Sequence, residues 1–309
     1  MNPAVKPTHG SIVYTVEGLV AQALGIPHPP ELIPVIPKYV FCDKSLWSRL
    51  GTSFCRVVIE YGPQGLENAL TRSKVVERFD GVYGAFQPYL ESWKILFVVE
   101  PREALQNRIA RPIAFLDEIL IEVLKALREF GVSLSELGLT GSLAAELENQ
   151  KVSDIDLVVY GASSSLKVFE AFISTSPIVS LRNSFGGLLV NPPVNVGWRR
   201  TLVRGREVSW IGVPLEGELC EPLSSYERVL RPTRFVEKEV TIEPGQETSL
   251  LYPPCVKTAP GEVLISFEYN LAVSFYEGGK FVVRGVADER EEVIYLGTRE
   301  NPGELVKVS

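Results

Sequence analysis

The segment Gly138-Leu139-Thr140-Gly141-Ser142, followed after a short interval by Ser153-Asp154-Ile155-Asp156-Leu157-Val158-Val159-Tyr160-Gly161, decides how this chain folds. The second part is an apolar run that contains two aspartates one residue apart. Alternate residues of a strand point to the same face, so Asp154 and Asp156 are expected to project together while Ile155 enters the core. Two carboxylates this close repel each other and raise each other's pKa. The pair therefore predicts a cation nearby.

Gly141 and Ser142 predict a phosphate site beside these carboxylates. Glycine lets the chain turn tightly and lets a phosphate approach the backbone. Ser142 is expected at a helix N-terminus, where free N–H groups and the helix dipole favour phosphate oxygens. Mg²⁺ takes carboxylate oxygens and usually keeps substrate phosphates as further ligands. The arrangement suits displacement at a phosphorus atom. The plainer alternative is two surface acids and an ordinary N-cap serine.

A strand, Gly-Ser, a short helix and then Asp-x-Asp on the next strand resembles the signature of the DNA polymerase beta-like nucleotidyltransferase superfamily. The wording of both segments is similar to uncharacterised archaeal predicted nucleotidyltransferases, as are an upstream His28-Pro29 element and a β-rich tail. The resemblance implies that Asp154 and Asp156 bind Mg²⁺ or Mn²⁺. It also implies that Gly141 and Ser142, with Thr140 beside them, bind a nucleoside triphosphate such as ATP.

The resemblance further implies a third acidic residue on a later strand, as metal ligand and as base for the attacking hydroxyl. Residues 207–214 are the natural place, but Ser209 stands where an aspartate is expected. Glu207 lies on the same strand face and is the candidate replacement, although its carboxylate must reach about 7 Å further. Losing a general base typically slows a reaction by about 10²–10⁴-fold. The alternative is that Glu207 is a solvent-facing residue.

The predicted function is the transfer of a nucleoside monophosphate to a hydroxyl of RNA, a protein or a small molecule, with release of pyrophosphate. The alternative is a weak or inactive module that binds nucleotide or RNA as a scaffold or sensor. A net charge of -7 argues against a protein coated in basic charge for wrapping nucleic acid. One local basic stretch remains, and in it Arg199 and Arg200 are the candidates for contacting phosphates, with Arg204 and Arg206 close by. Its alternative is a solvated β-hairpin.

The fold class expected is α+β, with a strand-rich module of unknown role at residues 1–110. A nucleotidyltransferase domain, a mixed sheet packed by helices, is expected at 111–235, and a small β-rich domain at 236–309. Apolar residues at helical spacing predict a helix over 115–130. Strands are expected at 136–140, 154–160 and 206–213 within the central domain, with a short helix over 143–148. Residues 101–112 are expected to form the boundary that precedes this domain.

Four cysteines complete the sequence-based picture, and none lies in a CxxC pair. A zinc site is therefore not expected, and the cysteines are predicted to be reduced, buried packing residues of a cytoplasmic protein. Apolar runs long enough to cross a membrane are not found, so no membrane span is predicted.

Overall fold

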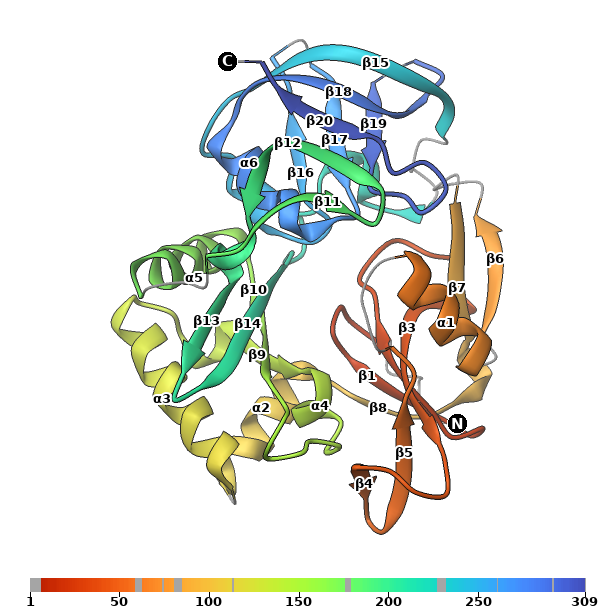
Figure 1. Cartoon of the computed structure of the whole chain (residues 1–309), viewed down its shortest axis with the longest axis vertical. Coiled ribbons are helices and arrows are strands. Elements are labelled where there is room, and N and C mark those ends of the chain that lie inside the picture. The colour runs from red at the N-terminus through yellow and green to blue at the C-terminus, as the bar shows by residue number, and fades with distance from the viewer. Residues whose placement is uncertain are drawn as a thin grey trace. The chain divides into compact units, whose positions relative to one another are not determined.

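The computed structural model describes residues 7–58, 63–73, 75–80, 85–112, 114–175, 179–226, 232–259, 261–290 and 292–308. Helices and several sheets are combined in a strand-rich α+β fold (Figure 1), as predicted. The chain divides into two compact units, each made of non-consecutive segments. Unit 1 comprises Met1–Glu77, Pro88–Tyr160 and Arg200–Ile211, and unit 2 comprises Arg78–Gln87, Gly161–Arg199 and Gly212–Ser309. The division into three consecutive domains stays a prediction.

The first sheet belongs mainly to unit 1 and has the strand order β4-β5-β3-β2-β1-β8, with β7 also paired to β3 and β6 to β7. Its strands are β1 (Ile12–Thr15), β2 (Leu19–Ala23), β3 (Leu32–Phe41), β4 (Trp47–Arg49), β5 (Thr52–Arg56), β6 (Val76–Asp80), β7 (Ala85–Glu91) and β8 (Ile95–Val99). The 3₁₀ turn η1 (Ser92–Lys94) precedes β8, and helix α1 (Pro63–Ser73) packs against β3. The pairs β1–β2, β2–β3 and β3–β5 are antiparallel. Strand β1 is buried along its whole length and β2 nearly so, which means that the middle of this sheet is covered on both faces.

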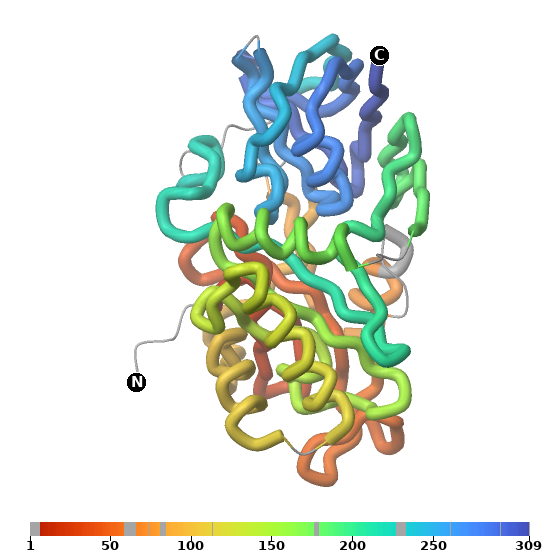
Figure 2. The backbone as a smooth tube through the Cα atoms, turned by 90° about the vertical axis from the view of Figure 1, so that its left-hand side faces the viewer, coloured from red at the N-terminus to blue at the C-terminus, as the bar shows by residue number. Residues whose placement is uncertain are grey.

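The second sheet of unit 1 carries the segment that opened the sequence analysis, in the order β13-β14-β10-β9. Its strands are β9 (Leu137–Thr140), β10 (Ile155–Tyr160), β13 (Arg200–Val203) and β14 (Arg206–Val213). Its helices are α2 (Pro101–Ala110), α3 (Phe115–Glu129) and α4 (Gly141–Ala144), with the 3₁₀ turn η2 (Leu134–Glu136) before β9. Figure 2 shows α2 and α3 as neighbouring yellow coils. The strands and the long helix expected here are confirmed.

Two local features of this region were not anticipated. Within the stretch expected as a domain boundary, Pro101–Ala110 form α2, because Pro101 occupies the first helical turn where its missing N–H costs nothing. The boundary itself stays a prediction. The helix packs on β9, and Gly138 has no room for a side chain against Pro101. A helix expected over 143–148 stops at Ala144, because Glu146 adopts a left-handed backbone with φ of 53°.

Unit 2 is built around a sheet of order β11-β12-β20-β18-β19-β17-β16, with β15 also paired to β18. Its strands are β11 (Leu181–Phe185), β12 (Leu188–Asn195), β15 (Pro232–Ile242), β16 (Cys255–Lys257), β17 (Val263–Ser266), β18 (Gly279–Asp288), β19 (Val293–Leu296) and β20 (Glu304–Lys307). Its helical elements are α5 (Ala162–Ser174), α6 (Ala272–Glu277), η3 (Val196–Arg199), η4 (Glu221–Leu223), η6 (Glu247–Leu250) and η7 (Tyr269–Leu271). The tail is β-rich as expected, but its sheet also takes in β11 and β12 from before residue 235.

The cysteines differ from the prediction. Cys42 is joined to Cys55 in unit 1, and Cys220 to Cys255 in unit 2, with Cα–Cα distances of 5.8 Å and 6.4 Å. Of the four, only Cys255 is buried. The expectation of reduced, buried thiols is therefore wrong, because the fold brings together cysteines that are 13 and 35 residues apart. Cys55 of β5 meets Cys42 just after β3, and Cys255 of β16 meets Cys220 just before η4.

Helices able to span a membrane, both long and apolar enough, are not found among the described residues. A cytoplasmic location stays a prediction.

Candidate functional site

The carboxylate pair lies at the start of β10. Asp154 directly precedes the strand and Asp156 is its second residue, while Ile155 and Leu157 between and after them are fully buried. Both aspartates line one cavity of unit 1 together with Gly141 and Ser142. The structure thus brings the two motif segments to a single place.

The surroundings of Asp154 oppose its ionisation. Burial, followed by the negative charge of Asp156, raises the pKa of Asp154 to about 6. The charge of Arg56 opposes this rise, and the charge of Glu207 adds to it. A partly buried acid beside a second acid favours a bound cation, because a cation offsets both the desolvation and the repulsion.

Gly141 and Ser142 lie directly against this pair. Gly141 has φ of 67°, and a Cβ atom built on it would overlap Oδ2 of Asp156, so only glycine fits at this turn. Ser142 is 8% exposed, and its Oγ has no hydrogen-bond partner among the residues that the structure describes. A buried hydroxyl without a partner costs free energy, and a ligand oxygen in the cavity would relieve that cost.

Ser209 occupies the place where the resemblance implies a third acid. It is buried on β14, the neighbour of β10, and its Oγ donates a hydrogen bond of 2.6 Å to Oδ1 of Asp156. Glu207 is half-buried on the same strand and forms an ion pair of 3.4 Å with Nη1 of Arg200. Glu207 is near enough to influence Asp154, but it is not among the side chains that line the cavity.

The other predicted phosphate ligands lie elsewhere. The Thr140 hydroxyl donates to the Gly10 carbonyl at 2.6 Å and is buried, so it serves the packing of β9. Arg200 pairs with Glu207. Arg199 belongs to unit 2, where its guanidinium lies 5.0 Å from the ring centroid of Tyr269. None of these three lines the cavity as the described residues define it.

The nearby arginines have structural contacts. Arg206 donates to the carbonyls of Gln150 and Lys151 at 2.9 Å and 2.6 Å, and so holds the turn that leads into Asp154. Arg204 pairs with Glu118 on α3 at 3.1 Å. The basic stretch is thus neither a simple solvated hairpin nor a lining of the cavity, and in part it fixes the approach to β10.

Among the cavity residues that were not anticipated from the sequence, four have charged or aromatic side chains. They come from the N-terminal sheet, namely Lys38, Tyr39, Trp47 and Arg56. In the sequence they are single residues of ordinary strands, about a hundred positions away from the motif, so no local pattern marks them. Only the folded chain places them opposite the carboxylates.

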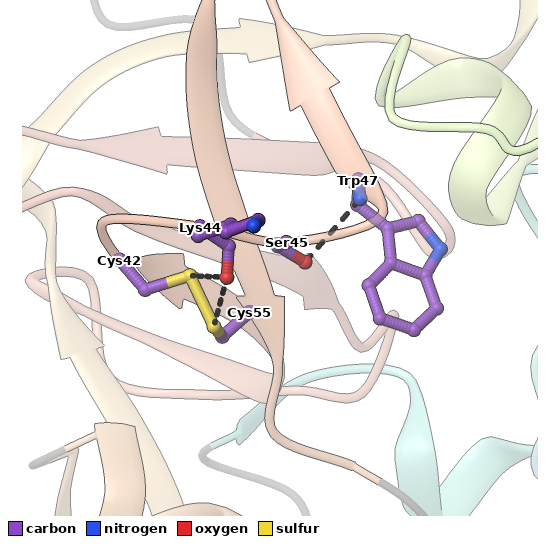
Figure 3. The surroundings of a disulfide bond; sticks show 5 residues. All are labelled: Cys42, Lys44, Ser45, Trp47 and Cys55. Atoms are coloured by element: carbon purple, nitrogen blue, oxygen red, sulfur yellow. Dashed lines mark hydrogen bonds between the residues drawn. A yellow bond between two sulfur atoms is a disulfide. The ribbon is translucent and has the colours of Figure 1, made fainter.

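The loop that carries Trp47 is closed by the Cys42–Cys55 bridge. Figure 3 shows the carbonyl of Lys44 beside both sulfurs, at 3.8 Å and 3.9 Å, and the backbone N–H of Trp47 donating to Oγ of Ser45 at 3.3 Å. Arg56 directly follows Cys55. The disulfide therefore restrains the segment that joins Trp47 to Arg56.

The donor set fits a hard divalent cation that keeps substrate phosphates as ligands. Asp154 and Asp156 offer carboxylate oxygens, and Mg²⁺ is commonly bound by one or two carboxylates with phosphates and water completing its shell. Among the described residues, no group of three or more His, Cys, Asp or Glu side chains is placed to hold a metal ion by itself. The described residues therefore fit a site in which the phosphates of the substrate complete the coordination of the metal ion.

Comparison of the chain with protein-family models, with curated proteins and with solved structures finds no match. The functional interpretation consequently depends on the geometry of the cavity.

Proposed function

We propose that this protein is a metal-dependent nucleotidyltransferase, which transfers a nucleoside monophosphate from a nucleoside triphosphate to a hydroxyl of RNA, a protein or a small molecule. One observation carries the proposal. The carboxylates of Asp154 and Asp156, the tight turn at Gly141 and the partnerless hydroxyl of Ser142 line one cavity of the described chain. The resemblance to the polymerase beta-like superfamily rests on the same residues and supports it from the sequence alone.

Each of these residues has a defined part in the proposed reaction. Asp154 and Asp156 hold Mg²⁺ or Mn²⁺, which when bound neutralises the carboxylates and polarises the phosphate oxygens. Ser142 donates its hydroxyl to a phosphate oxygen, and Gly141 leaves the space for that approach. The acceptor hydroxyl attacks the α-phosphorus as the bond to the bridging oxygen breaks, pyrophosphate leaves, and the hydroxyl proton passes to solvent.

Purified protein with Mg²⁺ and each of the four nucleoside triphosphates provides the test. We expect binding of at least one triphosphate and a slow release of pyrophosphate when an acceptor is present. Asp154→Asn should abolish both the metal-dependent binding and the release, whereas Asp43→Asn, an exposed aspartate outside the cavity, should change neither. Failure of all four triphosphates to bind would end the proposal.

Ser209 favours a second candidate function. Because a hydroxyl stands where the third carboxylate is expected, and Glu207 is engaged with Arg200, the acceptor lacks an evident general base among the described residues. The module would then bind a nucleotide as a sensor or scaffold without turnover. Release of pyrophosphate that Asp154→Asn abolishes would exclude this function, whereas metal-dependent binding without any release would favour it.

A further inference from the structure

We propose that the N-terminal sheet supplies the substrate-binding half of this site, with Lys38 and Arg56 contacting the triphosphate and Trp47 covering the nucleobase. The inference rests on the proposed function and gives a role to a module whose sequence suggests none.

The cavity itself is shared between the two sheets of unit 1. Lys38 and Tyr39 come from β3, Trp47 from β4 and Arg56 from the end of β5. All four line the same cavity as the Gly141–Ser142 turn and the two aspartates. The two groups of lining residues are far apart in the sequence. They meet because the N-terminal segment contacts β9 and the residues that follow the Gly141–Ser142 turn.

Three contacts hold the first sheet against that segment. The Thr140 hydroxyl donates to the carbonyl of Gly10 at 2.6 Å, directly before the Gly-Ser turn. The Tyr14 hydroxyl donates to the Ala145 carbonyl, and Arg49 pairs with Glu146 at 2.8 Å, both just after it. Because these contacts flank the turn on both sides, the cationic side chains of the first sheet are held in a fixed relation to it.

The charges of the cavity call for such cations. A triphosphate is strongly anionic, and a divalent ion that neutralises Asp154 and Asp156 leaves no positive charge to balance the phosphates. Arg56 is exposed and its charge already acts on Asp154 across the cavity. Its Nε donates to the Val58 carbonyl at 2.8 Å, which orients the guanidinium, and it forms no ion pair with any described residue. Arginine suits phosphate oxygens because its donors match their geometry.

Lys38 lines the same cavity and is half-buried. Burial, and then the positive charge of Lys38, lower the pKa of the nearby His9 to about 4, so this histidine is neutral at neutral pH. Lys38 and Arg56 are therefore the positive charges that the described part of this wall presents to a ligand.

Trp47 gives the cavity an aromatic wall. The indole is half-buried, and the buried ring of Tyr39, which lines the same cavity, contacts it at a centroid distance of 6.1 Å and a tilt of 54°. An aromatic ring that lines a cavity offers a surface on which a base stacks, a contact worth about 1–3 kcal/mol per base. The hydrogen bond from its backbone N–H to Ser45 and the neighbouring disulfide fix the position of the residue.

Calorimetric titration of the full chain with two probes separates these roles. The probes are a Mg²⁺-nucleoside triphosphate and Mg²⁺-tripolyphosphate, which has the phosphates but no base. Arg56→Gln and Lys38→Gln should weaken the binding of both probes by about 10- to 100-fold. Trp47→Leu should weaken nucleotide binding by about 5- to 100-fold and leave tripolyphosphate binding unchanged.

Matched variants control for charge and for folding. Arg72→Gln removes an exposed arginine of α1 outside the cavity, and Trp93→Leu removes a tryptophan that is 72% exposed outside it. Neither should alter binding. Arg56→Lys keeps the charge and should recover most of the affinity lost in Arg56→Gln, which a merely misfolded variant would not show.

The outcomes distinguish this inference from the proposed function. If the wild-type chain binds the nucleotide and Arg56→Gln and Lys38→Gln bind it equally well, the inference is overturned while the proposed function stands. Equal loss of both probes in Trp47→Leu would overturn the stacking role. If the wild-type chain binds neither probe, the proposed function fails and the inference falls with it.

Discussion

The hydroxyl of Ser209 donates a hydrogen bond of 2.6 Å to Oδ1 of Asp156. The bond joins β14 to β10 at the position where the nucleotidyltransferase resemblance implies a third carboxylate. The hydroxyl holds the Asp156 side chain in place, but it cannot accept the proton of an attacking hydroxyl as a carboxylate does. The contact between Ser209 and Asp156 is therefore the structural feature that separates the two proposed functions, an enzyme and a nucleotide sensor.

Replacing Ser209 with aspartate should convert a slow or silent site into a faster one. Ser209→Asp places a carboxylate beside Asp156, and we expect Mg²⁺-dependent release of pyrophosphate to rise by about 10-fold or more. Ser209→Asn is the matched control, since it has a similar size but no charge. Equal rates for the two variants would show that the third carboxylate is not what limits the reaction.

Asp154 should make the metal-free protein less stable above pH 6. The pKa of Asp154 in the folded chain is raised to about 6, so ionising this carboxyl costs folding free energy. That cost is absent below about pH 4, where the carboxyl is protonated in both the folded and the unfolded chain, and it is complete above about pH 6. Asp154→Asn should therefore raise the free energy of unfolding at pH 8 without metal by about 1–3 kcal/mol. Added Mg²⁺ should raise the Tm of the wild type and not that of the variant. A lower Tm of the metal-free variant would contradict the repulsion described here.

Gly141 should tolerate no side chain. Gly141→Ala strains a residue with φ of 67° and brings a Cβ into Oδ2 of Asp156. Gly205→Ala is the matched control, because Gly205 has φ of 78° and open space within 4 Å of the point where a Cβ would lie. The control should cost about 1–2 kcal/mol of stability in urea denaturation, and Gly141→Ala more, together with loss of nucleotide binding. Similar costs and intact binding in both would refute the close approach.

His9 should make stability depend on pH. Burial, and then the charge of Lys38, lower its pKa from 6.5 to about 4, so between these values the unfolded chain binds a proton that the folded chain does not. The free energy of unfolding should thus fall as the pH falls from about 6.5 to 4, by up to about 3 kcal/mol from this group.

His9→Asn keeps an acceptor for the N–H of Gly25, which donates to Nδ1 of His9 at 3.0 Å. The difference in unfolding free energy between wild type and variant, measured by urea denaturation at each pH, isolates this histidine from the carboxylates. A difference that does not change across the window would contradict the buried neutral state. His28→Asn, at the second histidine of the chain, should keep the wild-type dependence.

The two disulfides should stabilise the chain by restricting its unfolded state. Their sequence separations of 13 and 35 residues correspond to about 3 and about 4 kcal/mol of loop-closure entropy. Cys42→Ala with Cys55→Ala, and Cys220→Ala with Cys255→Ala, should each lower the midpoint of denaturation relative to the oxidised wild type. Wild-type protein with reductant should have the same midpoint of denaturation as the variant in which all four cysteines are replaced by alanine. Identical wild-type midpoints with and without reductant would argue against the two disulfides.

Local pattern alone determined the centre of this protein. The helical spacing of apolar residues predicted α3, and the uninterrupted apolar run predicted β10 with Asp154 and Asp156 turned to one side. Gly141 was marked by the turn that its lack of a side chain permits. These features are readable because each depends on neighbours within a few positions, where backbone geometry fixes which side chains share a face.

Tertiary structure decided what surrounds that centre. The placing of Lys38, Trp47 and Arg56 in the cavity and the bond from Ser209 to Asp156 depend on which distant strands meet. Both cysteine pairings likewise depend on which distant segments meet. Helix α2 was not predicted for a related reason. Its apolar residues do not form a clear stripe, and the helix is stabilised by packing on β9. Such pairings arise from burial of apolar surface summed over the whole unit, and no periodicity within one segment encodes them.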